Sequence, residues 1–207
     1  MKILLVAITS LVLMGCAQTT YHPINDAAEK PVFGRQVRFE ITDTFYEDLP
    51  SCVVVWPYGN AQLEDAAARH LRGKVQRVIG IYERLRLTRI GAYDLANSKD
   101  RQAFSITHRC QFGLEFVSAN LEPDYLLIWS QKRAALNLVL RRTRDNAVLW
   151  RAHHEARRSD GGLALSPLSL IVNAAEAGLH LADKDVIHSV VDDSLRRMFK
   201  TLPDMRW

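Results

Sequence analysis

The sequence predicts an α/β (α+β) domain in which helices pack on a three-layer-like mixed sheet of about four to five strands. Short runs of β-branched and other apolar residues alternate along the chain with longer segments whose apolar residues recur every three or four positions. Residues typical of turns separate these segments, and two helical patterns follow one another near the end of the chain. A sheet with helices on it buries both kinds of apolar surface.

The first half of the domain is expected to contain two strands and two helices. Residues 52–56 form a continuous apolar run that Pro57 ends, which is typical of a buried strand. Residues 61–82 carry one apolar stripe at helical spacing, and residues 85–90 alternate apolar and polar side chains as a strand does. Residues 108–120 are then expected to form a second helix.

The second half is expected to contain a central strand, a hairpin and two helices. Residues 124–129 have the composition of a central strand. Residues 136–141 alternate apolar and polar side chains, residues 144–146 favour a turn, and residues 147–157 form the return strand. After an apolar helix, the last helix runs from residue 183 or 185 to residue 201, with basic side chains near its carboxyl end.

The amino-terminal residues have the pattern of a bacterial lipoprotein signal. Lys2 gives a positive start, and residues 3–14 are mostly apolar but too few to span a membrane, which takes roughly 20 residues. Gly15 is the small residue before the expected cleavage site, and Cys16 follows it directly. The similarity to lipoprotein signals implies cleavage between Gly15 and Cys16 and a diacylglycerol on the thiol of Cys16.

These features divide the chain into three parts. Residues 1–15 are expected to be the signal peptide, residues 16–45 a tether and lead-in with an edge strand at 37–42, and residues 46–207 a periplasmic α/β domain. No aspartate follows Cys16, which by resemblance to lipoprotein sorting signals implies the outer membrane, with the domain facing the periplasm. Two or more acyl chains would hold it there stably.

The charge of the chain argues against a nucleic-acid partner. The formal net charge of +4 falls to +3 when Lys2 leaves with the signal peptide, and such a mild charge does not require a polyanion. The partners we expect are the membrane, through the amino-terminal lipid, and an envelope protein, with a homo-oligomer as a further form. We expect no cofactor.

Two cysteines, Cys52 and Cys110, remain once Cys16 is lipidated. The periplasm is oxidising, so a disulfide between them is one alternative, and two buried free thiols are the other. The expected strand order puts the two cysteines toward opposite ends of the sheet and so favours free thiols. The chain has no CxxC motif, which disfavours a redox enzyme.

Three patterns in this chain recur in one group of bacterial envelope domains. They are the strand 53–56 with its turn, residues 123–127 before the alternating residues 136–140, and the turn 144–150 that ends in tryptophan. Through them residues 50–202 resemble the curli-secretion lipoprotein, the lipoprotein activators of penicillin-binding proteins and the amino-terminal domain of the Tol-system propeller protein. A break at residues 159–162 before the apolar helix makes the chain most similar to a family of neisserial-type lipoproteins.

The resemblance implies a non-enzymatic protein that assists envelope assembly, secretion or transport through protein contacts. The chain departs from the family pattern at Asn146, where the turn often has glycine. It also lacks a clear pair of alternating segments of about ten residues, which a pore of the curli type needs. A subunit of an oligomeric secretion pore is therefore an alternative function.

A second alternative is a metal-dependent or hydrolytic periplasmic enzyme. His180, Asp183, Asp185 and His188 are close enough in sequence to suggest ligands, and His188 with Asp192 suggests a base and its orienting acid. Carboxylates at a helix start beside a surface histidine explain the same residues more simply. No GxSxG motif surrounds a serine. We therefore expect no catalytic residues and no metal.

Residues 163–181 are more apolar than one core face requires. We expect either a partner or oligomer surface or a buried helix in this segment. The residues expected to form such a surface are Leu168, Ile171, Val172 and Leu179.

Overall fold

The computed structural model describes residues 19–24, 35–91, 93–126, 129–160 and 184–206. Its strands are β1 Thr19–Pro23, β2 Arg35–Ile41, β3 Cys52–Val55, β4 Arg77–Ile79, β5 Phe112–Leu126, β6 Trp129–Arg142 and β7 Val148–Asp160. Its helices are α2 Asp43–Glu47, α3 Ala61–Arg72, α4 Ile81–Ile90, α5 Ser98–Thr107 and α7 Lys184–Lys200.

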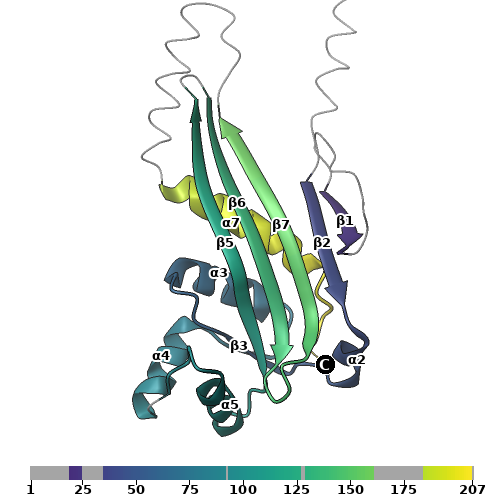
Figure 1. The fold of residues 1–207 in the computed structure, drawn as a ribbon, viewed down its shortest axis with the longest axis vertical. Helices are drawn as coiled ribbons and strands as arrows, with labels where there is room; N and C mark the ends of the chain where they lie inside the picture. Colours follow the sequence, from purple (N-terminus) through teal and green to yellow (C-terminus); the bar gives the residue numbers. More distant parts are fainter. Residues whose placement is uncertain (1–18, 25–34, 92, 127–128, 161–183, 207) are drawn as a thin grey trace, which may run out of the picture.

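The strands form one mixed sheet of seven strands in the order β1-β2-β7-β6-β5-β3-β4 (Figure 1). The α+β class is confirmed, but the sheet has more strands than the four or five expected. One reason is that the lead-in of residues 16–45 supplies β1 and β2, which pair with each other in parallel, while β2 also pairs with β7. The other is that residues 112–120 belong to a strand and not to the expected helix.

Two segments have a different secondary structure from the one expected, and one expected helix is shorter. Residues 108–120 were expected to be helical, yet residues 112–120 lie in strand β5. Every second side chain there, those of Phe112, Leu114 and Phe116, points into the main core, as a strand requires. Residues 85–90 were expected to be a strand, yet they lie in α4, which begins at Ile81 after the N-cap residue Gly80. The helix expected over 61–82 ends at Arg72, and β4 follows it.

The segment expected to be a central strand, residues 124–129, lies instead at the end of a long hairpin. β5 and β6 pair from Phe112 with Arg142 up to Leu126 with Trp129, and β7 pairs with the other side of β6. In Figure 1 these three strands extend well beyond the rest of the sheet. The expected turn at residues 144–146 joins β6 to β7, and the expected last helix is α7.

The main core lies between the sheet and the helices α3 and α7, which both pass behind the strands in Figure 1. The inward side chains of the sheet include Val53 and Val55 of β3 and the leucines of β6, all fully or almost fully buried. From α7, Leu195 and Met198 are fully buried. Burying one side chain of this size contributes roughly 1.5–3 kcal/mol to the free energy of unfolding. Because most of the buried apolar side chains lie in this core, it supplies most of the apolar stabilisation.

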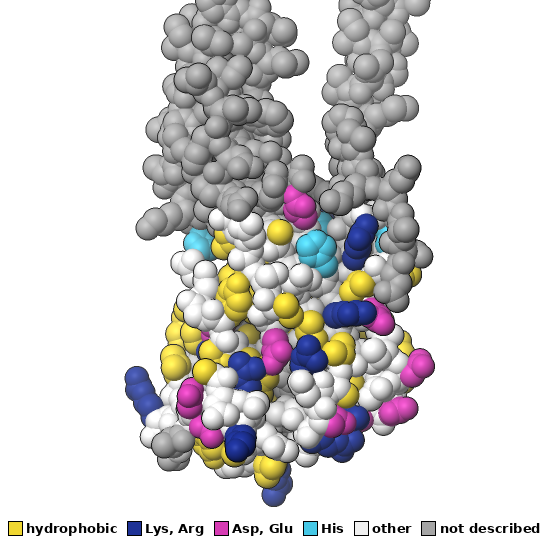
Figure 2. Space-filling model, viewed as in Figure 1, with side chains coloured by type: hydrophobic (Ala, Val, Ile, Leu, Met, Phe, Trp, Pro, Cys, Tyr) yellow, Lys and Arg dark blue, Asp and Glu magenta, His cyan; other side chains and the backbone are white. Residues whose placement is uncertain are grey.

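Among the described residues, helices cover the opposite face near β3 and β4. There Val54, Trp56, Ile79 and Phe104 form a second, smaller core with the α5 helix. In the described part of the chain, the expected three layers are therefore present at this side of the molecule. Along β6 and β7 the same face carries polar and charged side chains, which Figure 2 shows spread across the surface.

Candidate functional site: the groove between α3 and α7

A small hollow lies where α3, α7 and β5 meet. Its volume is about 190 Å³. Asn60 caps the start of α3 here, because its side-chain oxygen accepts hydrogen bonds from the backbone N–H groups of Gln62 and Leu63, both 3.1 Å away. The lining residues are Asn60, Gln62, Leu63, Asp65, Ala66, Arg69, Leu121, His188 and Val191.

Beside the hollow, an acidic side chain of α7 contacts two basic side chains of α3. Oδ1 of Asp192 lies 3.0 Å from Nε2 of His70 and 3.8 Å from Nη2 of Arg69. Arg69 also pairs with Asp65 of its own helix. The His70 ring stacks on Phe199, which is buried in the core. These contacts hold α3 and α7 together at the surface, over the core that the two helices share.

The structure therefore gives Asp192 a partner that the sequence did not suggest. The expected base and acid were His188 and Asp192, four residues apart on one helix, but Asp192 contacts His70 of α3 instead. His188 lines the hollow itself. His70 and Asp192 are 122 residues apart in sequence, so no local pattern could have joined them.

The arrangement brings histidine and carboxylate side chains together around the hollow. Among the described residues that line it, there is no serine or cysteine. Within the described part of the chain, no three His, Cys, Asp or Glu side chains gather as a metal site would require. Of the suggested ligands, His180 and Asp183 lie outside the described residues, as do Leu168, Ile171, Val172 and Leu179 of the expected partner surface.

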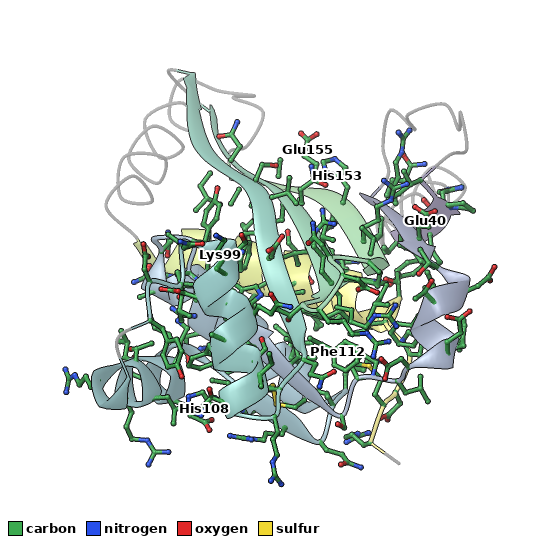
Figure 3. All side chains as sticks on the ribbon, turned by 60° about the horizontal axis from the view of Figure 1, so that its bottom comes forward. Glu40, Lys99, His108, Phe112, His153 and Glu155 are labelled. Carbon is green, nitrogen blue, oxygen red and sulfur yellow. A yellow bond between two sulfur atoms is a disulfide. The ribbon has the colours of Figure 1, made fainter. Side chains whose placement is uncertain are left out.

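The adjacent histidines of β7 point to opposite faces, as the strand pattern predicts. His154 is fully buried and its Nδ1 donates to the carbonyl oxygen of Gln36 on β2, 2.8 Å away. Burial lowers the pKa of His154 below its usual 6.5. His153 lies on the opposite face with Glu155, on the side of the sheet away from α7 (Figure 3). One imidazole is thus part of the core and the other is at the surface.

Cys52 and Cys110 form a disulfide, with Cα atoms 5.0 Å apart. Cys52 begins β3 and Cys110 comes just before β5, and these strands are parallel neighbours. The two cysteines therefore lie at the same end of adjacent strands. The expected strand order, which separated them, is wrong because the residues after Cys110 form β5 and not a helix.

A buried ion pair was missed by the sequence reasoning. Oε2 of Glu64 in α3 lies 2.5 Å from Nη2 of Arg84 in α4, and both side chains are at most 5% exposed. Oε1 of Glu64 accepts hydrogen bonds from the backbone N–H groups of Tyr58 and Gly59, and Arg84 donates to the carbonyl of Val55. The available signal was the position of Glu64, which directly follows Leu63 on the buried part of α3 and comes two residues before the alanines 66–68.

The expected lipidation site, Gly15 and Cys16, lies outside the described residues, and β1 begins at Thr19. Among the helices described, none is long and apolar enough to cross a membrane. The amino-terminal strand is therefore the described element closest in sequence to the expected anchor.

No protein-family model and no curated protein matches this chain. Several solved structures are similar to it. The PelC dodecamer from Paraburkholderia phytofirmans has a TM-score of 0.44 and 13% identity, over 81% of this chain and 98% of that one. A minor lipoprotein from Acinetobacter baumannii has a TM-score of 0.42 and 12% identity, over 74% and 91% of the two chains.

A lipoprotein from Neisseria meningitidis has a TM-score of 0.42 and 15% identity, over 64% of this chain and 99% of that one. The likeness to these proteins is one of fold.

Proposed function

We propose that this chain is a lipoprotein of the bacterial outer membrane, anchored by lipid on Cys16, whose domain faces the periplasm. It assists envelope assembly, secretion or transport through protein contacts, without catalysis. The observation that carries this proposal is the sequence Leu13-Met14-Gly15-Cys16 after a short apolar run. The thiol of Cys16 is the one side chain in that run that can take a thioether-linked diacylglycerol.

The disulfide between Cys52 and Cys110 supports export independently of the signal. Structural disulfides persist in oxidising compartments such as the periplasm and are rare in the cytosol. The two cysteines lie in the second core with Trp56 and Phe104, so the bond links secondary structure and does not resemble a redox-active pair.

The contacts around the groove support a non-catalytic role. Two of the side chains with acid–base capacity at the groove, His70 and Asp192, join α3 to α7. A lipid anchor confines the domain to two dimensions and so raises its effective concentration near envelope partners, which gives a mechanism without chemistry.

The test replaces Cys16 with serine in cells that make the full chain. We expect wild-type protein to fractionate with the outer membrane and to carry an acylated amino-terminal peptide in mass spectrometry. The Cys16→Ser protein should be found in the membrane fraction at about one tenth of that level or less, because the acyl chains supply the anchoring energy.

Met14→Ala is the matched control, because alanine is the commoner residue at that position of lipoprotein signals and lipidation should continue. If Cys16→Ser protein stayed in the outer membrane as wild type does, or if the amino-terminal peptide carried no lipid, the proposal would fail. Crosslinking in intact cells with the Met14→Ala protein then identifies the envelope partner.

A further inference from the structure

The outer side of helix α4 carries four exposed side chains at the spacing of one helix face. They are Tyr82, Leu85, Arg86 and Arg89, which follow one another at intervals of three, one and three residues. Tyr82 is 76% exposed and Leu85 is 50% exposed, so two large apolar side chains meet solvent beside two guanidinium groups. We call these four residues the α4 face.

The other side of α4 is fixed to the domain. Arg84 is buried in its ion pair with Glu64 of α3, and Leu87 packs on the second core. Glu83, the acidic residue of this helix, has its Oε1 atom 3.2 Å from Nη2 of Arg77 in β4. These contacts explain the inner residues of α4 and involve no residue of the α4 face.

The positive charge of the α4 face is not offset within the part of the chain that the structure describes. Arg86 and Arg89 have no carboxylate partner there. The two residues are three positions apart on the helix, so their like charges are neighbours, which is unfavourable. On α7, by contrast, the exposed Arg196 pairs with Asp193, three residues before it. A carboxylate from another molecule would offset the charge that α4 leaves uncompensated.

We propose that the α4 face binds an acidic segment of an envelope protein. Carboxylates of that segment pair with Arg86 and Arg89, because the planar guanidinium fork matches a carboxylate through two parallel hydrogen bonds. An apolar side chain of the segment packs against Tyr82 and Leu85. Tyrosine and arginine are enriched among the residues that dominate the binding energy of protein interfaces. This inference rests on the proposed function, since it names a surface for the protein contacts of that function.

The place of α4 in the fold favours a protein partner over the bilayer that holds the lipid. Helix α4 follows β4, which is one edge of the sheet, and β1 is the other edge. Six strand spacings of about 4.8 Å separate the two edges, or about 29 Å. Thr19 in β1 is three residues from Cys16, which an extended chain spans in at most about 11 Å. Figure 1 shows α4 on the side of the domain away from β1, and so away from the proposed anchor.

Photocrosslinking in intact cells tests the proposal with the full-length protein. The photoreactive amino acid benzoylphenylalanine replaces Tyr82 in one variant. In the matched control it replaces Tyr46 of α2, a tyrosine that is also well exposed on a helix but lies at the other side of the sheet. We expect the probe at Tyr82 to form a discrete protein adduct that the probe at Tyr46 does not form. Peptide mapping should place the crosslink in a partner segment rich in aspartate and glutamate.

Charge reversal separates a specific contact from chance proximity. We expect Arg86→Glu with Arg89→Glu to lower the yield of the Tyr82 adduct by about tenfold or more, because both carboxylate contacts become repulsive. The control, Lys99→Glu with Lys200→Glu, changes the net charge equally at exposed positions of α5 and α7 and should leave the yield unchanged. Both double variants are checked for an unfolding midpoint equal to that of the parent, and glutamine replaces glutamate if the midpoint falls.

Three results overturn the proposal. They are the absence of a protein adduct specific to the Tyr82 probe, an adduct with lipid or with a second copy of this chain in its place, and a protein adduct that charge reversal leaves unchanged. The mass of the amino-terminal peptide is measured in the same cells. A lipidated peptide without a Tyr82 adduct refutes the α4 contact and leaves the proposed anchor in place. A peptide without lipid refutes the anchor itself.

Discussion

The buried imidazole of His154 makes the stability of the sheet depend on pH. Its Nδ1 donates to the carbonyl oxygen of Gln36, so the proton added on ionisation would go to Nε2, which has no hydrogen-bond partner among the residues that the structure describes. Burial is the largest cause of its lowered pKa, the charge of Arg197 adds to it, and Asp193 opposes it. The unfolded chain therefore takes up the proton at a higher pH than the folded chain does.

The sign of this dependence follows from linkage. Above pH 6.5 both states have neutral His154 and no stability is lost, whereas below it the unfolded state binds more protons and the free energy of unfolding falls. We expect urea unfolding at pH 7.5 and 5.5 to show this loss, and His154→Asn to reduce it, because the amide still donates to Gln36 but does not titrate. His153→Asn, on the other face, should retain the full loss. An unchanged pH dependence in His154→Asn would contradict the role of burial.

Gly113 on β5 is a residue that tolerates no side chain. A Cβ atom there would lie 1.8 Å from Nε1 of Trp56, whose ring also has Phe104 against its edge and Arg101 over its face. We expect Gly113→Ala to lower the free energy of unfolding by about 2–3 kcal/mol through overpacking. Gly73→Ala is the control, since its Cβ would be 3.4 Å from the nearest atom at an ordinary negative φ. Equal denaturant midpoints for the two variants would refute this account.

Among the elements, those with a complete local signal could be predicted from the sequence. The β6–β7 hairpin is one, because its turn depends on Asp145 and Asn146. Asn146 has φ of +60°, which glycine and asparagine adopt most readily, so asparagine suits this position of the turn. Hydrogen bonds from Arg142 lower the pKa of Asp145 to about 2 and fix the turn.

The elements that the sequence mispredicted depend on distant contacts. In β5, a bulge between Phe116 and Ser118 leaves Val117 exposed and interrupts the alternation, so four apolar residues looked helical. In α4, a buried position is occupied by Arg84, which is stable there because Glu64 of α3 pairs with it. The groove was equally hidden, because His70 and Asp192 come from separate helices.

The disulfide links β3 to β5, two elements whose adjacency depends on a long connection. It closes 58 residues, and cross-linking a loop of that length is expected to stabilise the fold by about 4 kcal/mol by restricting the unfolded chain. We expect the Cys52→Ala, Cys110→Ala double variant to unfold at a lower guanidinium concentration by a comparable free energy. Reducing agent should destabilise the parent and leave the double variant unchanged. A parent insensitive to reductant would argue against the bond.

For the molecule as a whole, the boundary of the folded unit is the largest difference from expectation. The sequence suggests a domain that begins at residue 46, because residues 16–34 are polar and interrupted by proline. In the structure, however, β2 lies between β1 and β7, and Val37 and Phe45 are fully buried in the main core. Long-range pairing of β2 with β7 has no local signature beyond the alternation at residues 37–42.

A chain that begins at residue 46 should therefore fail to fold cooperatively. It would lose two fully buried side chains and leave five paired residues of β7, from Trp150 to His154, as an open edge. Open edges of this kind promote aggregation. It would also lose the hydrogen bond from Oγ1 of Thr42 to the carbonyl of Val148, which is 2.7 Å long. We expect loss of the sharp unfolding transition and concentration-dependent association in analytical ultracentrifugation.

Two longer chains show how much each amino-terminal strand contributes to cooperative unfolding. A chain from residue 17 should unfold in one cooperative step, and a chain from residue 34 should do so at a modestly lower midpoint, because it loses only β1, a short edge strand with largely exposed side chains. If the chain from residue 46 unfolded at the same midpoint as the chain from residue 17, residues 17–45 would be a tether and not part of the sheet.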